Sequence, residues 1–541
     1  MTSKEQKGAF IPSYSYASQT QAPRLDSVLK SSASWIVVPA IAMAVSLGVS
    51  LPTPARAAQA LGNDNNTVTL QNGAYGGNTY FTIAKGVTIS NYGGGSKPIY
   101  GDGSQNWTVN NAGVVAGANG NYAGITFANN GTVINSGTIE SNSSNQIAIK
   151  ILGTGRVVNS GLINLPNGTG VYIKNGSFTN TNTGTITVHQ QQSSDYGVHI
   201  ASDGAYVSNA GFIGNASAFR GYGVTIGNNG TVHNTGTIRG GIGIRANTGN
   251  YVYNSGLIVG NTRGIYLNTG TIVNFGTIIG SPNYGAVEFQ NAGGSVLKLM
   301  PGSVLSGGAY ARFGHYTNGS NGATFELSGT SAATISLQFG HQLNGAVKDF
   351  ANIVVDSGAN WTINGGGTLG SYATLTNNGT LLFNGTLEDG GRVINNNTGQ
   401  AGLQFGTGND ALYLNGDSVT LAGLTADGGA GSNTLGFTRY ESGTWTNGLS
   451  GSTACTNFDT FTVKSGSRWN FGGSNTITAG DVLNVNGGFQ NYGTLTVSGY
   501  MHNTGTFGRA FSGTASGVTL ANGGTLNNSG RIQRTDIGVV G

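Results

Sequence analysis

Side chains with the types and spacing that catalysis needs are few in this sequence. Only 20 of its 541 residues are Asp or Glu, whereas glycan cleavage usually needs a pair of carboxylates. Asp195 and Asp203 are the nearest approach to such a pair, and two solvated loop residues are the alternative interpretation. Gly416-Asp417-Ser418 begins like a serine-hydrolase nucleophile motif but stops there, and a triad also requires a base and an orienting group. We therefore predict no catalytic residue and a protein that is not an enzyme.

Metal-binding patterns are equally weak. Residues 406–412 and 428–435 resemble the nonapeptide calcium repeats of secreted β-rolls, but such sites need tandem copies, and Asn433 stands where an Asp belongs. Turn formation explains both stretches, so we predict no metal site and no cofactor. The histidines have no His, Cys or carboxylate at ligand spacing and are expected outward or in loops. They are His189, His199, His233, His315, His341 and His502.

The elements that carry these residues follow a repeat. Between residues 109 and 278 an apolar residue, Asn, Gly and an apolar residue recur at every second position, as in Val133, Asn135, Gly137 and Ile139. Alternating apolar residues predict short half-buried strands, and the Gly and Asn clusters between them predict turns. A repeat length in the twenties then predicts a parallel β-helix with three short strands per coil. The repeated Asn is placed at Asn111, Asn135, Asn159, Asn182, Asn209, Asn234, Asn254 and Asn274.

Stacked coils align equivalent residues into columns. Asn135 shares the inward parity of Val133, so we expect a buried Asn ladder at a turn. The first strand of each coil is expected to start at Gly124, Gly170, Gly197, Gly223, Gly241 and Gly264. One outward column should hold Thr126, Tyr172, His199, Thr225 and Tyr266, and another Thr138, Thr185, Thr237 and Thr277, interrupted by Leu162, Phe212 and Leu257.

Composition agrees with this architecture. Glycine supplies 95 residues and charged residues only 8%, which is unlike a helix-rich domain. With 37% hydrophobic residues the chain can bury a core, which argues against disorder. The net charge of +4 is spread thinly without a basic stripe, so no nucleic-acid partner is predicted. The single cysteine, Cys455, excludes an intramolecular disulfide.

The amino terminus has the pattern of an export signal. Residues 35–51 form an apolar run, and Ala55 and Ala57 supply the small residues that precede a cleavage site. A membrane anchor is the alternative, but the run is short for a membrane span. The preceding segment is long for a leader, so an extended signal and an upstream false start at Met1 both stay open. We predict export, with a mature protein that begins at Ala58.

Beyond residue 290 the repeat changes. Phe350 and Trp361 return as Phe458 and Trp469, both displaced by 108 positions. We interpret this region as two copies of a unit of about 110 residues, each made of several looser coils. The predicted divisions are 1–57 for the signal peptide with its extended leader, 58–290 for the regular β-helix, 291–405 and 406–507 for the two long units, and 508–541 for a terminal coil.

The combination of a signal peptide, N-x-G-T-I coils, and units of the form L-x-L-x-x-G-S-V and F-x-x-x-x-V-x-S-G-x-x-W resembles the passenger regions of Gram-negative autotransporters, the type V secretion family. The resemblance covers nearly all of the mature chain, and its motifs specify architecture more than activity. It implies a right-handed β-helix at the cell surface, in the outer membrane or secreted, with an outer-membrane β-barrel translocator as partner. The residues after Phe507 are expected to hold one further coil and no barrel. A truncated reading frame is favoured over secretion by a separate partner, because the Asn-Pro-Asn motifs of that branch do not occur.

We therefore predict a surface-displayed or secreted passenger, a structural and adhesive β-helix that mediates attachment or self-association. A host molecule, a glycan or a second copy of the chain is the expected ligand. A β-helical glycan lyase or hydrolase is the alternative.

Overall fold

The computed structural model describes a continuous stack of β-coils within the unit Pro54–Gly541. The unit Met1–Thr53 and the residues Ala55 and Ala57 lie outside the described residues, so the export signal stays a prediction. The described residues are 58–91, 97–117, 124–141, 146–189, 194–214, 220–291, 293–311, 322–339, 346–370, 373–389, 391–396, 402–415, 424–438, 442–509, 518–533 and 539–540.

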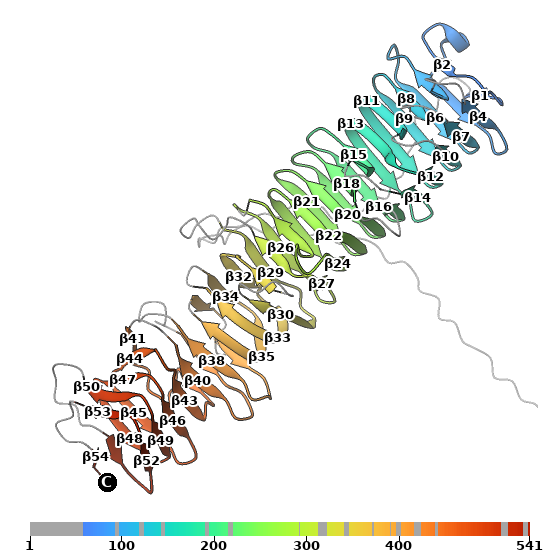
Figure 1. The fold of residues 1–541 in the computed structure, drawn as a ribbon. Helices are drawn as coiled ribbons and strands as arrows, with labels where there is room; N and C mark the ends of the chain where they lie inside the picture. The colour runs from blue at the N-terminus through green and yellow to red at the C-terminus, as the bar shows by residue number, and fades with distance from the viewer. Residues whose placement is uncertain are drawn as a thin grey trace, which may run out of the picture. The chain divides into compact units, whose positions relative to one another are not determined.

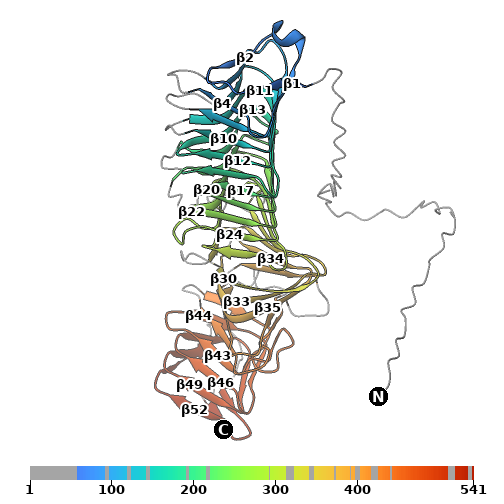
Figure 2. The same cartoon turned by 90° about the vertical axis from the view of Figure 1, so that its right-hand side faces the viewer.

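Each coil contributes a strand to each of three walls. In one coil these strands are β8 (Ile125–Phe127), β9 (Gly131–Asn135) and β10 (Thr138–Ser141). In the next coil β11 (Gln146–Asn159) pairs in parallel with both β8 and β9, and β12 (Leu162–Leu165) pairs in parallel with β10. The strands of successive coils lie side by side in Figures 1 and 2. We refer to the walls that contain β8, β9 and β10 as the first, second and third wall.

Parallel pairing continues into the last described coils. A sheet of 45 strands accounts for most of the stack, and the remaining strands form a sheet of five and a sheet of four near the carboxyl end. The sheet of five includes β44 (Arg468–Phe471), β47 (Gly488–Asn491) and β50 (Thr506–Arg509). The predicted all-β parallel β-helix is thus confirmed, whereas the divisions near residues 290, 405 and 507 stay predictions. In the described part of the chain, no helix is long and apolar enough to cross a membrane.

Alternation along the strands builds the core. Val133 is fully buried, whereas its neighbours Thr132 and Ile134 are partly exposed. Val157 and Phe178 occupy the positions of Val133 in the next two coils and are also 0% exposed. Burial of one such side chain contributes roughly 1.5–3 kcal/mol, so in-register stacking gives every coil the same source of stability.

A ladder of Asn side chains lies where the second wall turns into the third. The Nδ2 of each Asn donates a hydrogen bond to the Oδ1 of the Asn in the next coil at 2.7–2.9 Å. Asn135 Nδ2 also donates to the carbonyl of Gly137 at 3.3 Å, a carbonyl that accepts the N–H of Leu162 in the next coil at 2.9 Å, so the ladder is tied to the backbone of the turn. The predicted ladder is confirmed, and its members are Asn111, Asn135, Asn159, Asn180, Asn209, Asn234, Asn254 and Asn274.

The fourth member is Asn180, and the prediction of Asn182 is wrong. Asn180 pairs in register with Asn159, because the alternation of the strand continues from Phe178 to Asn180 without a break. The turn that follows is two residues longer than in the other coils, so Asn180 Nδ2 donates to Gly184 at 3.0 Å, four residues ahead instead of two. Asn182 lies in this longer turn and is exposed.

The predicted starting residues of the first-wall strands need one further correction. Val224 pairs with Ile244, so Gly243 takes the place of Gly223, and the predicted start at Gly241 is two residues too early. The cause is a shift of register between Gly240 and Ile242, where the chain passes from the third wall to the first. The predicted starts at Gly124, Gly170, Gly197, Gly223 and Gly264 lie in one register. The prediction missed the coil between Gly124 and Gly170, because Ala148 stands there in place of the Gly.

Candidate functional site

The two carboxylates predicted as a possible pair lie at opposite ends of one strand. Asp195 precedes β15 (Tyr196–Ile200) and Asp203 follows it. Asp195 is 1% exposed and accepts a hydrogen bond from the backbone N–H of Gly168 at 3.0 Å. Asp203 accepts from the backbone and the side chain of Asn228 at 3.0 and 2.9 Å. Both carboxylates therefore bind amide groups of neighbouring coils, and the structure does not bring them together over one substrate position.

The calcium-like stretches form hydrogen bonds between coils. Asp410 accepts from the N–H of Gly385 at 2.6 Å, and Asn433 accepts from the N–H of Asp410 at 3.0 Å. Asp459 continues the series by accepting from the N–H of Asn433 at 3.0 Å. Within the residues that the structure describes, no three His, Cys, Asp or Glu side chains come close enough to hold a metal ion. Asp417 and Ser418 lie outside the described residues.

Two histidines belong to aromatic clusters on the outer surface. Burial lowers the pKa of His233, which stacks on Tyr253 at 4.6 Å between ring centroids. Burial and, to a smaller extent, the charge of Arg245 lower the pKa of His199, so this imidazole is neutral at pH 7. Such histidines serve as rings in a stack. His315 and His341 lie outside the described residues.

Aromatic and cationic side chains share the outward side of the first wall, and we refer to the central set as the ring column. His199 meets Tyr172 edge-on at 5.3 Å and stacks on Tyr196 at 4.7 Å. Tyr196 stacks on Tyr222 at 5.3 Å, and the Arg245 guanidinium lies over the Tyr222 ring at 5.3 Å. The ring column consists of Tyr172 on β13 (Gly168–Asn180), Tyr196 and His199 on β15, Tyr222 on β18 (Tyr222–Ile226) and Arg245 on β20 (Thr237–Ala246).

The same chemistry continues on both sides of the ring column. Toward the amino end, the Lys97 ammonium lies 4.1 Å from the centroid of Tyr100. Toward the carboxyl end, Arg263 lies over Tyr266 at 5.0 Å and over Tyr284 at 4.5 Å. The outward column predicted from the sequence is confirmed, and the register adds Lys150 and Arg245 within it and Tyr100 before it. Among the described residues, the column from Tyr100 to Tyr266 consists of Tyr100, Thr126, Lys150, Tyr172, His199, Thr225, Arg245 and Tyr266.

The outward column of the third wall alternates between Thr and large apolar residues. Leu162 pairs with Thr185, and Phe212 pairs with Thr185 on its other side. The predicted Thr column is confirmed, and its interruptions are regular: an apolar residue occupies every second coil. We refer to this set as the threonine–apolar column. Its ten members, one per coil, are Thr88, Val114, Thr138, Leu162, Thr185, Phe212, Thr237, Leu257, Thr277 and Val304.

Beside the threonine–apolar column runs a second outward column, two residues further along each strand. It carries a carboxylate, Glu140, and a guanidinium, Arg239, which follow Thr138 and Thr237 by two positions. All four side chains are partly exposed. Thr185 lies two coils from the coil of Glu140 and two coils from the coil of Arg239. The two opposite charges are therefore placed symmetrically about Thr185.

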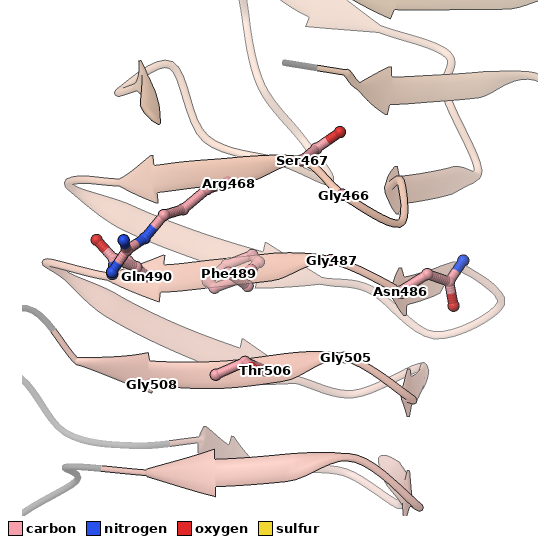
Figure 3. A pocket seen from close by; sticks show the side chains of 11 residues that line it. Gly466, Ser467, Arg468, Asn486, Gly487, Phe489, Gln490, Gly505, Thr506 and Gly508 are labelled. Atoms are coloured by element: carbon pink, nitrogen blue, oxygen red, sulfur yellow. The ribbon is translucent and has the colours of Figure 1, made fainter. Parts of the chain in front are cut away.

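A shallow depression of about 400 Å³ lies on the outer side of β44, β47 and β50 (Figure 3). It exists because Gly488 and Gly508 present no side chain there. A Cβ at Gly488 would meet nothing closer than Arg468 Cγ at 3.3 Å, and its φ is not left-handed, so the backbone does not require glycine. Gln490 accepts a hydrogen bond from Arg468 Nε at 3.0 Å and donates to Asn470 Oδ1 at 2.7 Å.

The chemistry of this depression is limited to hydrogen bonding and one positive charge. Its lining contains no Asp, Glu, His, Cys or Lys. General acid–base catalysis therefore has no group to use there.

Comparison of the chain with models of known protein families, with characterised proteins and with solved structures gives no match. Function has to be inferred from the surfaces themselves. Among the described residues, the band around the ring column and the threonine–apolar column are outer surfaces with an ordered pattern over many coils.

Proposed function

We propose that the chain is an adhesive β-solenoid of the autotransporter passenger type, displayed on or released from a Gram-negative cell, and that it acts by self-association. The threonine–apolar column carries this proposal. Leu162, Phe212 and Leu257 point outward at every second coil, and a regular row of partly exposed apolar side chains is a surface suited to a partner with the same period. A second copy of the chain has that period.

The area of the surface is adequate for a stable contact. Nine coils at about 4.8 Å per coil, with two outward columns, give a strip of roughly 600 Å² on each copy. A pair of copies would then bury about 1,200 Å², which is at the lower end of the range of specific protein interfaces.

One symmetry operation matches both apolar and charged groups. A two-fold axis across the strip at Thr185, the fifth coil, turns two copies face to face with opposite coil order and matches the nine coils from Thr88 to Thr277. Leu162 of one copy then faces Phe212 of the second copy. Glu140 of one copy faces Arg239 of the second, twice per pair, since each lies two coils from the axis.

Substitution of the apolar members tests the proposal. Leu162→Thr with Phe212→Thr makes the column uniformly Thr, so we expect at least a tenfold weaker dimer in sedimentation analysis and less clumping of cells that display the chain through an added autotransporter barrel. Ile134→Thr with Val158→Thr is the matched control, because these residues point outward on the second wall. Equal loss in both double variants contradicts the third-wall interface.

Charge exchange gives a second, independent test. Glu140→Arg alone and Arg239→Glu alone each place like charges across the axis and should weaken the dimer. The double variant restores opposite charges and should restore association. A double variant weaker than either single variant contradicts the two-fold arrangement.

A further inference from the structure

The first wall carries a second ordered surface, separate from the threonine–apolar column. We refer to the ring column together with Lys97, Tyr100, Lys150, Arg263 and Tyr266 as the cationic band. Four ammonium or guanidinium contacts with aromatic rings, at 4.1–5.3 Å from the ring centroids, lie in it or at its edge. A ring beneath a cation fixes the position of the charge and leaves it at the surface.

Accessible charge in the cationic band is positive. Of the acidic residues beside it, Asp195 and Glu288 are each 1% exposed, and Asp102, two positions after Tyr100, is partly exposed at the amino end of the band. Glu288 forms an ion pair with Arg263, while Lys150 has no ion pair within the described residues. Burial, and then the positive charge of Lys150, lower the pKa of Lys97, so two cations repel each other at the amino end of the band. An anion bound between them would relieve this repulsion.

The band has the repeat of an extended polymer. Successive coils offer one side chain each at a spacing of about 4.8 Å. Thr126 and Thr225 of the same register column keep their hydroxyl oxygens buried, so the accessible groups of the column are its cations and aromatic rings. A sugar unit advances a polysaccharide chain by a similar length, so the groups of the band can meet successive sugar hydroxyls and carboxylates along the stack.

The arrangement of the rings decides between a polysaccharide and a nucleic acid. Tyr196 has His199 on one side and Tyr222 on the other, and Arg245 covers Tyr222, so the ring faces are already in contact with neighbours. Single-stranded nucleic acids need open ring faces for base stacking. With these ring faces occupied, the band presents ring edges and cations, which suit sugar hydroxyls and acidic groups better than unstacked bases.

From these observations we infer that the cationic band binds an acidic polysaccharide laid along the coils. Lys150, Arg245 and Arg263 contact its anionic groups, and the tyrosine edges contact its hydroxyls. The ligand is polyanionic through carboxylate or sulfate groups, and these two sources share the same contacts.

Binding of defined polymers to the purified full chain tests the inference. The probes are polygalacturonate, dextran sulfate, unmodified dextran and single-stranded DNA, measured by biolayer interferometry. We expect binding to polygalacturonate or dextran sulfate, and at least a tenfold higher Kd for Lys150→Gln with Arg245→Gln. A preference between the two acidic polymers identifies carboxylate or sulfate as the better ligand group. Circular dichroism of each variant checks that the coils are intact.

Lys464→Gln is the matched control, because the Lys464 ammonium lies 3.6 Å from the centroid of Tyr413 in the same type of contact, several coils away from the cationic band. Its Kd should equal that of the unsubstituted chain. Equal binding to unmodified dextran, tighter binding to DNA, failure to bind either acidic polymer, or equal losses in Lys464→Gln and the double variant each overturn the inference. Self-association should be unchanged in the double variant, so failure of this site and failure of the third-wall interface are distinguishable.

Discussion

Replacement of Asn180 with Leu should weaken the stack locally, whereas the same replacement at Asn182 should not. Asn180 Nδ2 donates to Gly184, Asn209 Oδ1 and Phe212 at 3.0, 2.9 and 3.3 Å, and its Oδ1 accepts from Asn159 at 2.9 Å. Leu removes all four bonds.

The magnitude follows from the groups left without a partner. Asn159 Nδ2 keeps a bond to Gly161 at 3.2 Å, so its loss is partial. The Gly184 carbonyl keeps its bond from the N–H of Phe212 at 3.0 Å, so Asn209 Oδ1 is the group that loses its donor, and one buried polar group without a partner costs about 1–3 kcal/mol. We expect Asn180→Leu to cost about 1–3 kcal/mol. Asn182 is exposed, so Asn182→Leu should change stability by less than about 0.5 kcal/mol.

Native-state hydrogen exchange is the appropriate assay, because a solenoid opens coil by coil and one melting temperature averages over many coils. Protection should fall in β13 and β16 (Tyr206–Asn209) for Asn180→Leu and stay unchanged for Asn182→Leu. Equal exchange in the two variants, or a larger effect at Asn182, would refute the ladder as a source of stability.

Three further predictions concern pH, packing and processing. Asp389 is buried with its Oδ1 bonded to the N–H of Gly391, and burial raises its pKa from 3.8 to about 7. The unfolded chain releases this proton near pH 4, whereas the folded chain keeps it until the pH reaches about 7. The free energy of unfolding is therefore highest below about pH 4 and falls as the pH rises through 7, by up to about 4 kcal/mol. Asp389→Asn should remove this part of the pH dependence in denaturation measured from pH 4 to 8, and an unchanged profile contradicts it. Gly137→Ala should lower the melting temperature, because its Cβ would lie 2.1 Å from a carbonyl oxygen, whereas Gly62→Ala meets nothing within 4 Å and should melt like the parent. Mass spectrometry of exported protein should find Ala58 at its amino end, and retention of the upstream apolar run in membranes would contradict cleavage.

The fold could be predicted because alternation and turn residues are local properties. Val133 and Asn135 have the same parity in the sequence and the same inward direction in the structure. Asn182 was predicted in place of Asn180 because an N-x-G spacing describes the turn and not the strand. The longer turn after Asn180 keeps the strand register while it changes the spacing to the Gly, so parity with Phe178 was the better guide.

The surfaces were harder to predict, because they depend on which residue lies above which. Lys150 and Arg245 complete the first-wall column, yet the coil of Lys150 lacks the initial Gly and the coil of Arg245 follows a register shift. A search for repeated phrases misses both, and without them the column shows Tyr, Thr and His but no positive charge. The regular alternation in the third wall was present in the sequence, but Leu162, Phe212 and Leu257 looked like interruptions of a Thr row until the register placed one of them in every second coil. In a solenoid the chemistry of a surface is therefore set by the register between coils, and small changes in turn length redistribute that chemistry without changing the fold.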